Sequence, residues 1–112
     1  MVSLSIKRIY EKPSAEDGLR LLVDRLWPRG ISKQDAKLDG WPKEIAPSPD
    51  LRKWFDHKPE RFKEFSRRYR AKLKGNPALD ELRSLKGKVT LVYGARDPRI
   101  NHAIVLAKVL KP

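Results

Sequence analysis

The feature that most constrains the fold is the long connection between two predicted strands. Residues 19–26 and residues 88–94 are both apolar enough to be strands, and residues 27–87 between them carry helical patterns. Two parallel strands need a connection of about a dozen residues or more, usually a helical one. We therefore expect these strands to pair in parallel, through a right-handed crossover, and to end at the same edge of a sheet.

A further strand is predicted at residues 2–10, where apolar side chains alternate before a break in register. Residues 13–18 are predicted to form a turn or a single helical turn, with Ser14 and Asp17 at the spacing of a capping box. The apolar run after this turn favours a central position in the sheet for residues 19–26.

Helices are predicted where a capping signal precedes apolar residues spaced three and four apart. The predicted helices start at Ser32, Ser48, Pro59, Asn76 and Asp97, and end near Gly40, Phe55, Lys74, Gly87 and Leu110. In the third of them the apolar stripe is Phe62, Phe65, Tyr69 and Leu73, and in the last one it is Ile100, Ala103, Ile104, Ala107 and Leu110. The 112 residues are thus expected to form one α/β domain, with a small, mostly parallel sheet of about three strands and several helices packed on it.

The amino-acid composition excludes several kinds of functional site. The chain has no cysteine, which excludes disulfides, thiol nucleophiles and thiolate metal sites. The two histidines have no other candidate metal ligands near them in the sequence, so no metal site is predicted. The phosphate-binding and serine-hydrolase motifs are also absent, and no cofactor is predicted. Without a signal peptide or an apolar run long enough for a membrane helix, we expect a cytoplasmic protein with no membrane partner. Scarce Asn and Gln, with 36% charged residues, point to a heat-adapted source.

The formal net charge of +12 favours anionic partners, either small metabolites or nucleic acid. A solvated, lysine-rich surface is the alternative explanation of the same charge. Residues 52–74 hold ten Lys or Arg and three acids, and this basic face could bind nucleic acid. However, Glu64 precedes Arg67 and Arg68 by three and four residues, which is the spacing of ordinary ion pairs on a solvated helix.

The end of the second predicted strand carries the first group of candidate ligand-binding residues. Asp24, Arg25, Trp27 and Arg29 follow the apolar run directly. The planar guanidinium groups of two arginines could clamp one phosphate or carboxylate, with the indole as an apolar wall. The alternative is that these charges pair with one another and only fix the loop, while the indole belongs to the core.

The end of the third predicted strand carries the second group. Arg96 and Asn101 are candidate ligand-binding residues, and His102 is a candidate general acid or base near the start of the last helix. His57 is a second candidate acid or base, although it could equally be an ordinary residue at a helix end. Asp97 is predicted to cap the last helix.

Three segments together resemble a known family. They are D-R-L-W-P-R-G at residues 24–30, L-R-K-W-F-D-H at 51–57, and Y-G-A-R-D at 93–97 with Asn101-His102-Ala103. The chain is similar to the short, bacterial and archaeal form of the domain-of-unknown-function 488 family, nearly from end to end. The resemblance implies an α/β fold and no established activity, although some members are labelled transcriptional regulators. Longer relatives carry a cysteine-containing segment where this chain has residues 93–96, so the resemblance does not extend to thiol chemistry.

The leading hypothesis is a protein that binds a small anionic ligand in an Arg/His pocket at the carboxyl edge of the sheet, with catalysis by a histidine left open. The alternatives are a nucleic-acid-binding module that uses residues 52–74 and a non-catalytic interaction protein whose pocket is only an ion-pair network. The sequence does not fix the oligomeric state.

Overall fold

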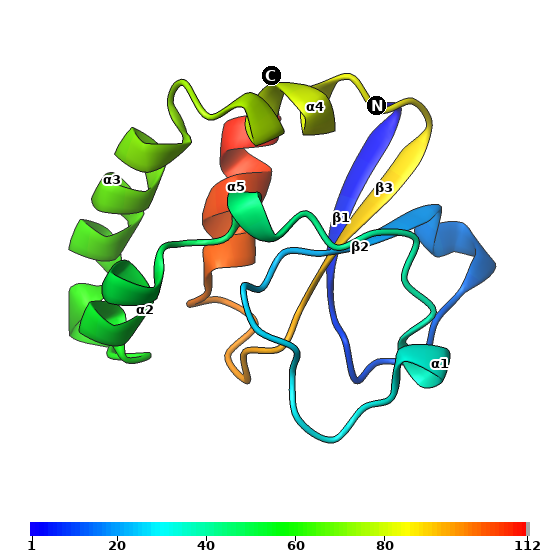
Figure 1. The fold of residues 1–112 in the computed structure, drawn as a ribbon, viewed down its shortest axis with the longest axis horizontal. Helices are drawn as coiled ribbons and strands as arrows, with labels where there is room; N and C mark the ends of the chain where they lie inside the picture. Colours follow the sequence, from blue (N-terminus) through cyan, green and yellow to red (C-terminus); the bar gives the residue numbers. More distant parts are fainter. Residues whose placement is uncertain (112) are drawn as a thin grey trace.

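A three-stranded parallel sheet forms the centre of the protein (Figure 1). The computed structural model describes residues 1–111, and its strands are β1 (Ser3–Arg8), β2 (Leu19–Leu22) and β3 (Lys88–Tyr93). β3 lies between the other two and pairs in parallel with both, so that Leu91 is opposite Ile6 on one side and Leu21 on the other. This confirms the predicted α/β class and the parallel pairing of the second and third strands.

The predicted central position of the second strand is wrong, because β2 lies at an edge of the sheet. Its outer side is nevertheless covered by the chain that follows α1. Leu22 N donates to Gly40 O at 3.1 Å, and Asp39 N donates to Arg20 O at 2.8 Å. A non-strand segment thus satisfies and covers the edge, which explains why β2 has the apolar composition typical of an inner strand.

The helices begin largely where capping residues predicted them. They are α1 (Lys33–Ala36), α2 (Pro49–Phe55), α3 (Phe62–Leu73), α4 (Pro77–Arg83) and α5 (His102–Leu110), with short 3-10 turns at Ala15–Asp17, Lys43–Ile45 and Pro59–Arg61. The side chains of Ser32, Ser48 and Asn76 accept hydrogen bonds from the first-turn N–H groups of the helices that follow them. Among residues 1–111, no helix is both long and apolar enough to span a membrane.

The predicted start of the last helix is wrong. α5 begins at His102, and its N-cap is the buried Asn101, whose Oδ1 accepts from Ile104 N at 2.9 Å. Asp97 Oδ1 instead accepts from the N–H groups of Arg99 and Ile100, at 2.8 and 3.2 Å. Asp97 therefore closes a turn of its own, and the backbone becomes extended at Asn101 before the helix starts.

The main core lies between the sheet and the helices on one of its faces. α5 packs against β1 and β3, and α3 packs against α5, as the ribbon shows (Figure 1). The predicted stripe of α3 is confirmed, because Phe65, Tyr69 and Leu73 are buried and Phe62 packs against them. The Tyr69 hydroxyl donates to Ile45 O at 2.5 Å, so the buried phenol is satisfied.

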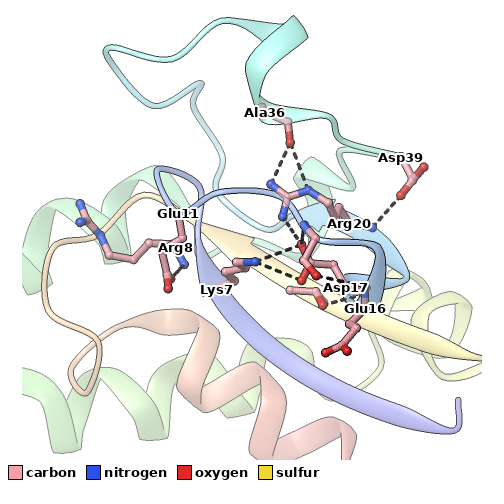
Figure 2. Close-up of polar contacts among 10 residues, drawn as sticks. Lys7, Arg8, Glu11, Glu16, Asp17, Arg20, Ala36 and Asp39 are labelled. Atoms are coloured by element: carbon pink, nitrogen blue, oxygen red, sulfur yellow. Dashed lines mark hydrogen bonds and ion pairs between the residues drawn. The ribbon is translucent and has the colours of Figure 1, made fainter.

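The other face of the sheet holds a smaller apolar cluster and a polar one that sequence reasoning missed. The apolar cluster is Ile9, Leu22, Ala36 and Val92, with Trp27, Ile31, Leu38 and Trp41 packed against it. In the polar cluster, Asp17 accepts from Lys7 Nζ at 3.1 Å and from an Arg20 nitrogen at 2.7 Å (Figure 2). The Arg20 guanidinium also donates twice to Ala36 O, which fastens α1 over the sheet.

The pKa of Asp17 reflects this cluster. Burial alone would raise it, but the hydrogen bonds from Ser14 N, Lys7 and Arg20 outweigh burial and hold the pKa of this carboxyl below its ordinary value. Asp17 therefore stays ionised and keeps the buried Arg20 paired.

Candidate functional site

The two strand ends that carry the candidate residues meet at the carboxyl edge of the sheet. Asp24 Oδ2, just beyond β2, accepts from Gly94 N, just beyond β3, at 3.0 Å. His102 at the start of α5 lies against the same carboxylate. The predicted proximity of residues 24–29 to residues 94–102 is thereby confirmed. The edge where parallel strands end is also where open α/β sheets commonly bind ligands.

Gly94 allows this close approach because it has no side chain. A Cβ at this position would lie 2.9 Å from Asp24 Oδ2 and 3.1 Å from Pro28 Cβ. Both distances are shorter than ordinary van der Waals contact. The residue type at position 94 therefore decides whether the 24–30 loop can lie on the end of β3.

His102 Nε2 forms a hydrogen bond with Val23 O and also lies beside Asp24 Oδ1, a buried oxygen that has no hydrogen-bond partner among residues 1–111. Its Nε2 lies 2.9 Å from Asp24 Oδ1 and 3.1 Å from Val23 O. Because a carbonyl oxygen only accepts hydrogen bonds, the contact with Val23 O requires a proton on Nε2, and Nδ1 is then the ring atom free to face a ligand. His102 could therefore act as an acid or base, or as a cation, through Nδ1. Its side chain is only 15% exposed.

A cavity of about 390 Å³ opens beside this contact. It is lined by residues from the ends of all three strands and from α2, α3 and α5, namely Tyr10, Asp24, Arg25, Leu26, Trp27, Pro28, Arg29, Pro47, Arg52, Phe55, His57, Phe65, Gly94, Ala95, Asn101 and His102. The structure thus brings the predicted site residues together except Arg96, which is exposed and lies outside the lining. A volume of this size suits a small molecule.

Three of the predicted residues have their polar groups engaged by the backbone. The Arg25 guanidinium donates to Pro47 O at 3.1 Å and to Ala46 O at 3.0 Å. Trp27 Nε1 donates to Ile31 O at 2.8 Å, and both polar ends of the Asn101 amide are used at the start of α5. These side chains shape the cavity, and Trp27 offers it an apolar surface.

Arg29 and Arg52 differ from Arg25 in having exposed guanidinium groups. Among residues 1–111, no carboxylate oxygen lies within 4.0 Å of either group. The loop carrying Arg29 is tied to the end of β1, because the Tyr10 hydroxyl donates to Arg29 O at 2.5 Å. The cavity therefore has two arginines whose charge no nearby carboxylate neutralises.

His57 lies at the cavity because the backbone at residues 56 and 57 adopts a left-handed conformation. Asp56 and His57, which follow α2, have φ values of 49° and 53°, in the left-handed region that non-glycine residues rarely adopt. Two such residues in succession cost conformational energy, and backbone of this kind is enriched at functional sites. The turn places the exposed His57 at the cavity beside the Phe55 ring, with a centroid distance of 6.1 Å.

Sequence reasoning missed several lining residues. Tyr10, Arg52, Phe55 and Phe65 come from segments distant in sequence from both strand ends. The only signal that could have indicated Arg52 is its place in the L-R-K-W-F-D-H segment beside His57. As for metals, the described residues contain no group of three His, Cys, Asp or Glu side chains placed to hold an ion.

Comparison with known proteins establishes the relationship suggested by these segments. The family described as the inactive DUF488-N3 subclade matches residues 3–112. The chain belongs to this family. An uncharacterized protein of Mycobacterium tuberculosis is 48% identical over 107 residues, which cover 94% of this chain and 91% of the relative. The uncharacterized protein YeaO of Escherichia coli is 42% identical over 115 residues, which cover 98% of each chain. No solved structure matches the chain.

Membership of the DUF488-N3 family confirms the resemblance noted in the three segments. All three segments fall within residues 3–112, and each contributes side chains to the cavity. The segments by which the chain resembles its family are therefore separate in the sequence but meet at one cavity.

Proposed function

We propose that the protein binds a small phosphate or carboxylate ligand in the cavity at the carboxyl edge of the sheet, without turning it over. The observation that carries this proposal is the pair Arg29 and Arg52, which line one cavity with no carboxylate within ion-pair distance among residues 1–111. Guanidinium groups bind such anions with paired, directional hydrogen bonds.

The charge balance of the cavity supports an anionic ligand. Its one carboxylate, Asp24, is engaged by Gly94 N–H and by His102. Three arginines and two histidines face this single acid in the lining. The net positive potential attracts anions, and the field of a chain with net charge +12 adds to it.

Binding without turnover is favoured by what the lining lacks. Within the described residues, the cavity is lined by no Ser, Thr, Cys or Lys, so the side chains that could attack a bound ligand are limited to Tyr10, Asp24 and the two histidines. The description of the family as an inactive subclade agrees with this. In this proposal His57 and His102 contribute hydrogen bonds, whereas acid–base catalysis through either of them is the alternative.

Calorimetric titration with inorganic phosphate and with acetate, at constant ionic strength, tests the proposal. Arg29→Gln and Arg52→Gln should each weaken binding of at least one of these anions about tenfold, the loss expected for one charged hydrogen-bonding partner. Arg96→Gln is the matched control, because it removes the same charge from an exposed position outside the lining. An equal loss in all three variants would show that only overall charge matters and would contradict a specific site.

Nucleic-acid binding by residues 52–74 is the second candidate. The exposed side chains of Arg70, Lys72 and Lys74 support it. Against it, Glu64 pairs with both Arg67 and Arg68 at 2.7 Å, and their hydrogen bonds lower the pKa of Glu64 to about 2. If residues 52–74 do bind nucleic acid, Glu64→Gln should strengthen binding to mixed-sequence DNA and steepen the salt dependence of that binding. Unchanged binding in this variant would count against the candidate.

A non-catalytic interaction protein, in which the cavity is only a structural network, is the third candidate. It predicts that Arg29→Gln lowers the melting temperature, while calorimetric titrations with anions give the same result for this variant as for the parent protein. The same calorimetric and melting measurements therefore separate it from the leading proposal.

A further inference from the structure

The lining of the cavity is partly apolar, and a bare inorganic anion would make no use of this apolar part. Phe55 and Phe65 line the cavity with their rings stacked at a centroid distance of 4.3 Å, and both are buried. Trp27 adds to the apolar part, since its only polar atom is already bonded to Ile31 O. A phosphate or acetate ion held by arginines gains nothing from these surfaces.

The rim of the cavity is also unusual, because it exposes large apolar side chains. Leu26 is 60% exposed and Tyr10 is 43% exposed, and both line the cavity. The third large apolar residue exposed among the described residues is Val2, at the opposite end of β1 from Tyr10. Exposed apolar surface gathered at a cavity mouth is typical of a ligand-binding site.

Cations and apolar surfaces thus belong to the same cavity. Arg29 is separated from Trp27 by one residue in the 24–30 loop, and Arg52 precedes Phe55 by one turn of α2. A ligand that used both features would carry an anionic group at one end and a flat apolar body at the other. The volume of about 390 Å³ has room for such a molecule.

From this arrangement we infer that the ligand is an anion that carries an aromatic ring, an aryl phosphate or an aromatic carboxylate. The inference rests on the proposed function, because it assumes that Arg29 and Arg52 bind the anionic group. The ring lies against Trp27, Phe55 and Leu26.

Four titrations at constant ionic strength test the inference, with phenyl phosphate compared with inorganic phosphate and benzoate compared with acetate. The ring should tighten binding about tenfold or more in at least one pair, because it removes apolar surface from water. A preference for the ring in either pair supports the inference and identifies the anionic group.

Leu26→Ala provides the structural test. It should reduce the preference for the ring and leave the affinity for the bare anion unchanged, and its exposed position keeps the fold intact. Val2→Ala is the matched control, since it removes an exposed apolar side chain outside the cavity lining and should change neither affinity.

The outcomes also separate this inference from the proposed function. Equal affinity for phenyl phosphate and phosphate, and for benzoate and acetate, would overturn the aromatic ligand while leaving anion binding in place. If none of the four anions binds, or if neutral benzyl alcohol binds as tightly as they do, anion binding itself fails. A preference for the ring that survives in Leu26→Ala and is lost in Val2→Ala would place the ligand elsewhere and overturn the inference.

Discussion

His102 Nε2 lies 2.9 Å from Asp24 Oδ1, and through this contact the start of α5 is joined to the end of β2. Because Asp24 also accepts from Gly94 N, one carboxylate connects the end of β2 to the end of β3 as well as to the start of α5. The cavity is built around this carboxylate, so its geometry depends on contacts that form only when the sheet and α5 are assembled.

Replacing Asp24 by Asn should destabilise the fold by about 1–3 kcal/mol, because it places a partly buried NH₂ donor beside the Nε2 donor of His102. The new amide can still accept from Gly94 N, but its NH₂ group then faces the protonated Nε2 of His102. Urea unfolding at neutral pH measures the loss. Asp35→Asn, at an exposed position, is the control and should change stability by less than about 0.5 kcal/mol. Equal stability of the two variants would contradict a structural role for the Asp24 carboxylate.

Replacing Gly94 by Ala should cost about 1–3 kcal/mol, because the new Cβ meets Asp24 Oδ2 and Pro28 at about 3 Å or less. The loop must then move, and the NMR signals of the His102 ring should shift with it. Gly75→Ala is the control, since its φ of 79° introduces backbone strain but no atom lies within 4 Å of the added Cβ. Gly75→Ala should leave the His102 signals unchanged. If Gly94→Ala leaves them unchanged as well, the contact of the 24–30 loop with the end of β3 is contradicted.

Asp17 should make stability fall in acid. Its pKa is lower in the folded state than the ordinary value of 3.8, so the unfolded chain binds the proton more readily. The stabilisation is present above pH 4 and is lost as the pH falls below this value. Urea unfolding across this range should show a weaker pH dependence in Asp17→Asn than in the parent protein. This variant should also be about 2 kcal/mol less stable at neutral pH, because the buried Arg20 keeps its bonds to Ala36 O but loses its carboxylate partner.

Glu16→Gln provides the control for Asp17, because Glu16 is an exposed acid in the same turn. It should leave the acid dependence unchanged. A parent protein whose stability is flat in this pH range would show that the carboxyl is not held in its ionised form by Lys7 and Arg20.

Tyr69 should resist ionisation until the protein unfolds in alkali. Burial raises the pKa of its phenol well above the ordinary value of 10, so the folded state disfavours the phenolate. Its contribution to stability is complete below pH 10 and is lost as the pH rises above it. The phenolate absorbance of Tyr69 should therefore appear together with alkaline unfolding.

The hydrogen bond of Tyr69 can be tested separately by Tyr69→Phe, which leaves the buried Ile45 O unpaired and should cost about 1–2 kcal/mol. Tyr10→Phe is the control, because its bond to Arg29 O is exposed and should contribute less. A Tyr10→Phe loss as large as that of Tyr69→Phe would contradict this ranking.

Local sequence determined the elements whose signals lie within a few residues. Ser48 and Asn76 start their helices because each side chain bonds an N–H group of the next turn, whatever the rest of the chain does. The predicted start at Asp97 failed for a related reason. Asp97 and Asn101 both offer capping oxygens, and only the packing of the buried Asn101 decides which of them begins α5.

The sequence by itself also favoured parallel pairing of two strands, with residues 24–30 where one of them ends, because the long helical connection between them permits a parallel crossover. Only the tertiary structure decided the strand order, the covering of β2 by Asp39 and Gly40, and the arrival of Tyr10 and Arg52 at the cavity. It also decided that Arg25 bonds the backbone, while no carboxylate oxygen of residues 1–111 lies within 4.0 Å of the Arg29 guanidinium. These outcomes depend on which distant groups come within bonding distance, and that is set by how the helices pack on the sheet.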